Sequence, residues 1–497
     1  MTTDNQAFSP VQRHLLTVTL IPMFMTLLSV SIVNVILPSI KTTLGADDSQ
    51  LQWVVSGYAL AFGVLLVAAG RAGDVYGRGR LFVAGLAVFG LGSLLAGLAP
   101  NTAVLNVARA LTGLGSGALG PQIIGLIQQF FSGPKRGRAF GLFGAVVGVS
   151  VAIGPVLGGL LIQIFGAEWG WRASILINVP IAAFAILMSK KWFPAGAWEP
   201  VPASDQPAGV QPDGVEVSRG RAKADVDPVG IILFGLSVLL VMLPFMEARA
   251  SAWFWAALPL GLIVLVVWIF WERSYERRGR SPMVDMNLFK TRSFANGTAL
   301  ISVHFTGMPA IWLIVAVYMQ NGQGKSALAA GAIGLPAAIL SAATSAIAGR
   351  HIVRLGRILV VTAQFVVLVG LLGSILVIWM IETWDISVWW LMIPLAFAGG
   401  AQGAVISPNQ TLTLADVPVQ YAGSAGGVMQ TGQRVGTAIG LALVTGIVFA
   451  SAAATGNWDH ATMTGFAAVF AIVALATALG VLDLFQSRKE RRDRYGA

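Results

Sequence analysis

The strongest constraint on the fold of this chain is a charged segment, residues 70–80, which separates two long apolar runs. The segment reads Gly-Arg-Ala-Gly-Asp-Val-Tyr-Gly-Arg-Gly-Arg, and the runs beside it cover residues 51–69 and 81–99. Each run has close to the ~20 residues that a helix needs to cross a bilayer. One carboxylate and three guanidinium groups cannot lie in hydrocarbon. We therefore expect a tight, charged turn between two membrane-spanning helices.

A looser copy of this segment begins at Gly349, 279 residues after Gly70. It reads Gly-Arg-His-Ile-Val-Arg-Leu-Gly-Arg and keeps both Gly-Arg pairs at the same spacing. Proline at positions 121 and 408, and alanine at 139 and 422, repeat at nearly the same distance. The pattern predicts a duplicated membrane protein. Such repeats place a substrate site at their interface, near the bilayer midplane.

The composition agrees with a membrane protein. The chain has 497 residues, of which 56% are hydrophobic and 11% are charged, whereas soluble domains carry about 25% charged residues. The absence of cysteine excludes disulfides, thiol redox chemistry and cysteine metal sites. The N-terminus has no charged region followed by a small-residue cleavage site, so we expect the first apolar run to be retained as a helix.

Fourteen apolar runs are long enough to cross the membrane. We place them at residues 14–38, 51–69, 81–99, 102–130, 139–165, 172–189, 229–246, 253–271, 294–319, 328–349, 358–381, 386–412, 421–450 and 462–485.

The basic residues predict the orientation of these spans. If the N-terminus is cytoplasmic, 26 of the 32 Lys and Arg residues lie on the cytoplasmic side, as the positive-inside rule requires. The remaining six lie in outer loops or inside spans: Lys41, Arg172, Arg249, Lys325, Arg109 and Arg434. The net charge of +10 therefore reflects membrane orientation and contact with anionic lipid headgroups, not nucleic-acid binding.

The order of the spans predicts an all-α membrane protein of two six-helix bundles and two extra helices. The first bundle covers residues 1–190, and a Pro-rich cytoplasmic linker covers 191–228. Two extra helices with a basic cytoplasmic loop cover 229–293, the second bundle 294–485, and a basic tail 486–497.

Three motifs within this arrangement place particular residue types at a fixed spacing. The charged segment places glycine, aspartate and arginine at Gly70, Arg71, Asp74, Gly77, Arg78 and Arg80. The fourth and fifth spans contain Arg109-x-x-x-Gly113 and Gly154-Pro155-x-x-Gly158-Gly159. Together these motifs resemble the major facilitator superfamily, and within it the fourteen-helix branch of drug:proton antiporters. The resemblance extends over nearly the whole chain and implies the major-facilitator fold.

The resemblance implies a role for each motif. The charged segment would clamp the cytoplasmic ends of the bundles, with Asp74 at the N-terminus of the helix that begins near Tyr421. A carboxylate there contributes ~0.3–1 kcal/mol, which suits a latch that must open. Arg109, about 10 Å deep in its span, would serve proton transfer and substrate binding. Alternatively, the segment is an ordinary basic loop, and Arg109 bonds helix carbonyls or reaches outward.

The third motif resembles the antiporter motif of exporters. Pro155 would open the helix backbone, and the glycines would let a neighbouring helix approach closely. Close packing without any further role is the alternative.

The first span departs from the branch. Residues 28–38 read Leu-Ser-Val-Ser-Ile-Val-Asn-Val-Ile-Leu-Pro, and Ser29 stands where the branch usually has an aspartate. That aspartate is commonly tied to proton coupling and cation recognition. Spans one to six also contain no deep Asp or Glu. We therefore expect weaker selection for lipophilic cations, and proton coupling, if present, through another group.

The remaining polar residues within spans are candidates to line a substrate cavity. They are Asn34, Gln52, Tyr58, His304, Asn409, Gln430 and Arg434. Arg434 lies roughly 20 Å into its span and His304 roughly 15 Å, where an imidazole could titrate. A histidine bonded to a neighbouring helix, and amides that join helices, are the alternative. Asp483 is expected at the membrane interface beside Arg488.

These features predict a secondary transporter in the bacterial cytoplasmic membrane, and no enzyme. It would export small amphipathic compounds by proton antiport; the alternative is an anionic metabolite or lipid with weak or no proton coupling. Residues 115–120 fit Gly-x-Gly-x-x-Gly but lie within a span without a preceding strand, so they do not bind a dinucleotide. We expect no cofactor, metal or ATP. The expected partners are a small-molecule substrate and membrane lipids, around a monomer.

Overall fold

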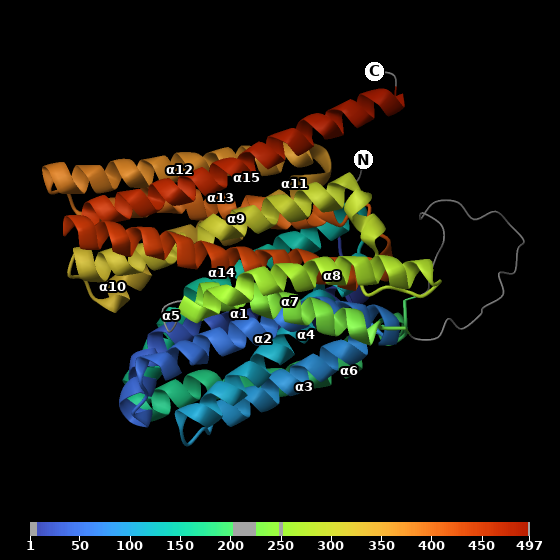
Figure 1. The fold of residues 1–497 in the computed structure, drawn as a ribbon, viewed down its shortest axis with the longest axis horizontal. Coiled ribbons are helices and arrows are strands. Elements are labelled where there is room, and N and C mark those ends of the chain that lie inside the picture. Colours follow the sequence, from blue (N-terminus) through green and yellow to red (C-terminus); the bar gives the residue numbers. More distant parts are fainter. Residues whose placement is uncertain (1–6, 202–224, 248–251, 496–497) are drawn as a thin grey trace, which may run out of the picture.

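The computed structural model describes residues 7–201, 225–247 and 252–495, and every regular element among them is helical (Figure 1). Most of the predicted linker 191–228 lies outside the described residues, as does Arg249. The helices are α1 (Pro10–Leu44), α2 (Asp48–Tyr76), α3 (Arg78–Gly97), α4 (Thr102–Phe130), α5 (Gly133–Leu176), α6 (Asn178–Trp192), α7 (Pro228–Glu247), α8 (Ala257–Arg277), α9 (Arg292–Val317), α10 (Ala327–Ala332), α11 (Leu335–Leu355), α12 (Arg357–Trp384), α13 (Met392–Thr413), α14 (Ala422–Thr455) and α15 (Trp458–Tyr495).

The segment predicted to form a charged turn is mostly helical. α2 continues to Tyr76 and α3 begins at Arg78, so Gly77 alone forms the turn, with a φ of 101° that favours glycine. The prediction of an eleven-residue turn was wrong because both helices continue beyond their apolar runs, where charged side chains leave the hydrocarbon while the backbone stays hydrogen-bonded. Gly356, with a φ of 53°, joins α11 to α12 in the same way, so the sequence repeat is also a structural repeat.

Thirteen helical stretches of the described residues are long and apolar enough to cross a membrane, one fewer than predicted. The difference lies in Gly133–Trp192, a stretch of 60 residues that contains the fifth and sixth predicted spans. Gly166 leaves helical geometry there, with φ 76° and ψ 178°. A Cβ atom on Gly170 would lie 2.5 Å from the Cα atom of Ile162, so the chain folds back on itself after Gly166.

The helices pack as two groups joined along two seams. In the first group, α1 packs on α5, while α2 and α3 pack on α4. In the second, α9 packs on α14 and α15, α11 on α13, and α12 on α13 and α15. The seams between the groups are α2 against α14 and α5 against α11. α7 and α8 pair with each other, and α7 lies against α2 and α14.

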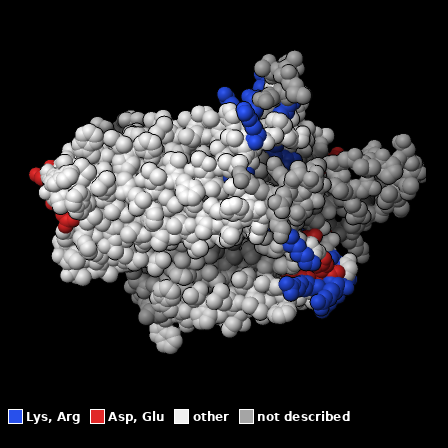
Figure 2. Space-filling view, turned by 90° about the horizontal axis from the view of Figure 1, so that it is seen from above, with Lys and Arg blue, Asp and Glu red and all other residues white. Residues whose placement is uncertain are grey.

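The hydrophobic core joins the two groups directly at one end, and a further cluster joins α2 to α14 through α7 and α8. One cluster contains buried residues of both groups, such as Phe140 and Phe294. Two further clusters at the opposite end each belong to one group, within residues 32–175 and 308–473. The shared cluster lies at the end where the described chain begins and ends, here called the terminal end (Figure 1). Figure 2 shows Lys and Arg side chains gathered toward this end.

Asp483 lies buried within the second group. It is 1% exposed and pairs with Arg292 and Arg357, each at 2.8 Å. Asn296 donates a further hydrogen bond to it at 3.0 Å. α9 and α12 each begin with an arginine directed at this position of α15, which buries the carboxylate between them.

The substitution Asp483→Asn tests this ion-pair cluster. It keeps the shape of the side chain but leaves two arginines without their counter-charge. We expect the free energy of unfolding to fall by about 3 kcal/mol, the lower end of the range for breaking a buried ion pair, because Arg292 keeps some exposure to solvent. Thermal unfolding of the purified protein in detergent measures the change. Asp385→Asn, at an exposed position with φ 51° that asparagine tolerates, is the control. Equal melting temperatures for the two variants would contradict this role of Asp483.

Candidate functional site

At the terminal end of the α2–α14 seam, Asp74 meets the N-terminus of α14, as the resemblance implies. Its Oδ1 accepts a hydrogen bond from the backbone N–H of Gly423 at 3.1 Å, and Oδ2 accepts one from Ser424 at 3.0 Å. Arg78 pairs with the same carboxylate at 2.7 Å. Asp74 and Arg78 are both buried, so the free N–H groups of a helix end and a guanidinium together compensate the carboxylate.

Arg78 also bonds three other segments. It donates to the carbonyl of Gly125 at 2.6 Å, to Oε1 of Gln129 at 3.1 Å, and to the carbonyl of Val419 just before α14 at 2.5 Å. We call Asp74, Arg78 and their partners at Val419, Gly423 and Ser424 the Asp74 cluster. It connects the two groups of helices by charge-assisted hydrogen bonds.

The other two arginines of the motif lie outside this cluster. Arg71 donates to the carbonyls of Asp225 at 2.9 Å and Ser281 at 3.4 Å, next to α7 and α8. Arg80 is exposed and makes no hydrogen bond within the described part of the chain. The motif thus divides between the α2–α14 seam and the two extra helices.

Glycines allow close approach at both seams. A Cβ atom on Gly70 would lie 2.3 Å from the carbonyl oxygen of Gly423, and one on Gly349 would lie 2.5 Å from that of Gly137. The two contacts correspond in the repeat, because Gly349 matches Gly70 in the copied segment. The position that matches Asp74 is Val353, which is 64% exposed, so the α5–α11 seam has no equivalent carboxylate.

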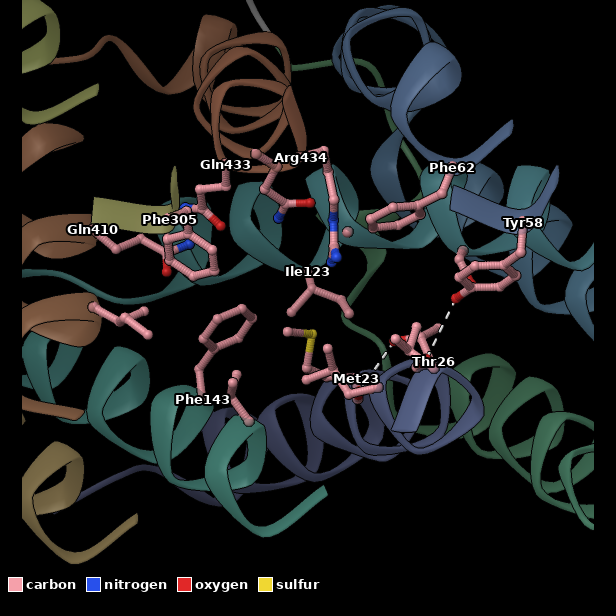
Figure 3. A pocket seen from close by; sticks show the side chains of 17 residues that line it. Met23, Thr26, Tyr58, Phe62, Ile123, Phe143, Phe305, Gln410, Gln433 and Arg434 are labelled. Carbon is pink, nitrogen blue, oxygen red and sulfur yellow. Dashed lines mark hydrogen bonds between the residues drawn. The ribbon is translucent and has the colours of Figure 1, made fainter. Parts of the chain in front are cut away.

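A cavity lies between the two groups of helices (Figure 3). Its volume is ≈ 70 Å³. Helices α1, α2, α4 and α5 line it from the first group, and α9, α13 and α14 from the second. Its lining residues are Met23, Thr26, Leu27, Val30, Tyr58, Phe62, Ser116, Gly120, Ile123, Phe143, Val147, Phe305, Ile406, Gln410, Gln430, Gln433 and Arg434.

The lining combines aromatic rings, carboxamides and one cation. The guanidinium of Arg434 lies over the ring of Phe62, 4.2 Å from its centroid (Figure 3). Tyr58 shares a hydrogen bond of 2.6 Å with Ser116. None of the lining residues is acidic, and among the described residues Arg434 forms no ion pair. The cavity therefore offers stacking surfaces, hydrogen-bond donors and acceptors, and a single positive charge.

Arg109 lies directly behind this lining. Its Nη1 donates to Oγ of Ser29 at 3.0 Å, its Nε donates to the carbonyl of Val54 at 3.2 Å, and its guanidinium lies 4.4 Å from the ring centroid of Tyr58. Ser29, in place of the aspartate of the branch, thus contacts the arginine directly. A Cβ atom on Gly113 would lie 2.3 Å from the carbonyl oxygen of Tyr58, so this glycine sets the close contact of α4 with α2.

Only three of the seven predicted cavity residues line the cavity: Tyr58, Gln430 and Arg434. Gln52 donates to the carbonyl of Met246 in α7, His304 bonds Gln364 at 3.2 Å, and Asn409 donates to the carbonyl of Gly297 at 2.9 Å. These three side chains join helices, which is the alternative considered for them. Asn34 is exposed and lies outside the cavity.

Several lining residues were not predicted from the sequence. Gln410 and Gln433 contribute carboxamides, and Phe62, Phe143 and Phe305 contribute rings. The only available signal was position: Gln433 precedes Arg434, and Gln410 follows Asn409. Nothing in the sequence distinguishes these phenylalanines from the other phenylalanines of the spans.

The Gly154-Pro155 motif packs α5 on α1. A Cβ atom on Gly154 would lie 1.8 Å from Oγ of Ser31, and one on Gly158 would lie 2.8 Å from Cγ1 of Ile32. Gly159 has no atom this near, and Pro155 is absent from the cavity lining. The motif therefore acts in helix packing beside the cavity.

Comparisons with known proteins agree with this architecture. A family model described as Major Facilitator Superfamily matches residues 19–249 and 227–441. The probable actinorhodin transporter of Streptomyces coelicolor is 33% identical over 432 residues, which cover 86% of this chain and 70% of that protein. The puromycin resistance protein pur8 of Streptomyces alboniger is 31% identical over 503 residues, covering 97% and 93%. The crystal structure of the human organic anion transporter MFSD10 shares the fold, with a TM-score of 0.63 at 13% identity over 95% of this chain and 100% of that one. The chain therefore belongs to the major facilitator superfamily, a family of membrane transporters and not of enzymes.

Proposed function

We propose that this protein exports small amphipathic, mainly aromatic compounds across the bacterial cytoplasmic membrane by alternating access. The observation that carries the proposal is the cavity, whose lining comes from both groups of helices. Movement of one group against the other would change the side on which such a cavity opens. The names of the relatives, one for actinorhodin transport and one for puromycin resistance, support export of antibiotic-like molecules.

Fourteen crossings with both termini in the cytoplasm fit this function. The 60-residue stretch Gly133–Trp192 would be roughly 90 Å long as one straight helix, about three times the hydrocarbon thickness, so its reversal at Gly166 supports two crossings. The basic side chains gathered at the terminal end support a cytoplasmic location for that end.

The arrangement of the core favours an outward-facing state. The groups share a hydrophobic cluster at the terminal end and have separate clusters at the other end, and α7 and α8 form a further cluster with α2 and α14. The Asp74 cluster would hold the cytoplasmic side closed and would have to break for the cavity to face inward. Because the cluster contains few hydrogen bonds, the free-energy cost of this opening stays small.

The residues that line the cavity indicate the kind of compound that it would bind. Aromatic rings and three glutamines suit flat molecules with several polar groups, and Arg434 with no acidic neighbour in the lining suits a negative charge. An exporter of anionic metabolites or lipids is the second candidate, and Arg434 is the observation that favours it. The proposed driving force is the proton gradient, without a cofactor or ATP.

Reconstitution into liposomes with an imposed pH gradient tests the proposal. We expect accumulation of a fluorescent aromatic compound that depends on the gradient and stops when an uncoupler removes it, because antiport links cargo movement to proton movement. Equal rates with and without the gradient would contradict proton antiport, and absence of vectorial movement would contradict transport.

Arg434→Gln tests the charge of the cargo. Fluorescein and rhodamine share a ring system and differ in charge, so transport of the pair isolates the contribution of charge. We expect the variant to lose about tenfold in fluorescein transport, as expected from ~1.4 kcal/mol of a charge-assisted contact, and little in rhodamine transport. Arg80→Gln, at an exposed position away from the cavity, is the control. A similar loss for both dyes would point to a general defect instead.

Asp74→Asn tests the Asp74 cluster. The chain contains no cysteine, so fluorescent labels can be attached at Arg80→Cys and Arg350→Cys, two exposed positions at the terminal end in different groups of helices. We expect the variant to shift the distance distribution toward larger separations, because the carboxylate that binds Gly423 and Ser424 loses its charge. Single-molecule energy transfer measures the shift. An unchanged distribution, matching that of Asp385→Asn, would exclude a locking role.

A further inference from the structure

A pair of buried carboxylates lies away from the cavity, where α7 begins and α8 ends. Asp227 precedes α7 and is 0% exposed, and its Oδ1 accepts a hydrogen bond from the backbone N–H of Gly230 at 3.0 Å. Nε1 of Trp271 donates to both of its carboxylate oxygens, at 3.0 and 3.1 Å. Glu272, in α8, is 1% exposed, and its Oε2 accepts from the backbone N–H of Val284 at 3.5 Å.

The two carboxylates converge on Gly230. A Cβ atom there would lie 2.3 Å from Oδ2 of Asp227 and 2.6 Å from Oε1 of Glu272, so these oxygens are no more than ~5 Å apart. Oε1 of Glu272 has no hydrogen-bond donor among the described residues. Nor does any Lys or Arg of the described residues form an ion pair with either carboxylate. Two such groups cannot both carry a full charge this close together and away from water, and one shared proton removes the repulsion.

A metal ion fits this site less well than a proton. Hard cations such as Mg²⁺ and Ca²⁺ take six or more oxygen ligands. Within the described ranges, no three His, Cys, Asp or Glu residues lie close enough together to hold a metal. A proton needs only the two carboxylates and would give the unpartnered oxygen of Glu272 a hydrogen bond.

Other charged and titratable groups near the pair contact one another. The hydroxyl of Tyr275 donates to Oδ1 of Asp225 at 2.7 Å. The guanidinium of Arg280 lies over the ring of Tyr275, 5.4 Å from its centroid, and that of Arg278 lies over Trp271 at 5.8 Å. These groups form an outer layer, and none of them makes an ion pair with Asp227 or Glu272 within the described part of the chain.

Arg71 connects this region to α2. Its Nη2 donates to the carbonyls of Asp225 and Ser281, which lie two residues before Asp227 and three before Val284. α2 also carries Asp74, three residues further along. We propose that Asp227 and Glu272 share one proton and form a proton-binding site at the base of α7 and α8, connected through Arg71 to the helix that carries Asp74. The site stands apart from the cavity and does not depend on the identity of the cargo.

Infrared spectroscopy of the purified protein tests the site without a transport assay. The C=O stretching band of a protonated carboxylic acid, identified by its shift in D₂O, should be present at neutral pH. We expect Glu272→Gln to remove it, because Asp227 alone keeps its hydrogen bonds from Gly230 and Trp271 as a carboxylate. We expect Asp227→Asn to shift its frequency, because the group that shares the proton changes. Both replacements keep the side-chain shape, and asparagine caps a helix as well as aspartate does. Glu276→Gln, at an exposed position of the same helix, is the matched control and should retain the band.

Three outcomes would overturn the proposal. They are a wild-type spectrum without the band at neutral pH, a band that Glu272→Gln leaves in place or Asp227→Asn leaves unshifted, and a band that appears only after a metal chelator is added. The first and third are read from the wild-type protein alone, so the test stands even if a variant fails to fold. Because no cargo is used, a failed transport assay would leave the result unchanged.

Discussion

The structure depends on a buried carboxylate that is neutralised by two kinds of positive charge. Asp74 receives the free N–H groups at the start of α14 and the guanidinium of Arg78. In surroundings of low dielectric constant, each of these groups would be costly without the others, so the three hold one another in place. Since Asp74 and α14 belong to different groups of helices, satisfying this charge also closes the terminal end of the molecule.

The closed end determines where a substrate site can form. A hydrophobic cluster is shared at the terminal end and the clusters at the other end are separate, and the cavity lies between the groups, where seven helices contribute to its lining. Ser29 alters the chemistry of this region. It gives Arg109 a neutral partner, and with Arg434 the surroundings of the cavity hold two guanidinium groups and no carboxylate in the lining.

Features set by hydropathy and local spacing could be predicted from the sequence, and features set by helix rotation could not. The spans, the repeat and the contact of Asp74 with the helix that begins near Tyr421 follow from apolar runs and from a specific motif. The cavity lining depends on which way each helix faces, and consecutive residues point about 100° apart. His304 and Asn409 were predicted to line the cavity, yet the next residues, Phe305 and Gln410, do so. The carboxylate pair was not predicted either, because Asp227 and Glu272 are 45 positions apart in the sequence and meet only when α7 and α8 pack together.

The two seams differ in the interactions that hold them together. The α2–α14 seam is held by buried, charge-assisted hydrogen bonds, which weaken once water enters. The α5–α11 seam is held by glycine contacts around Gly349, with Val353 where a carboxylate would otherwise be, so it has no such buried charge for water to solvate. A rocking motion would therefore begin by opening the charged side and would pivot about the glycine side. An asymmetric opening of this kind follows from a single difference between two copies of one ancestral segment.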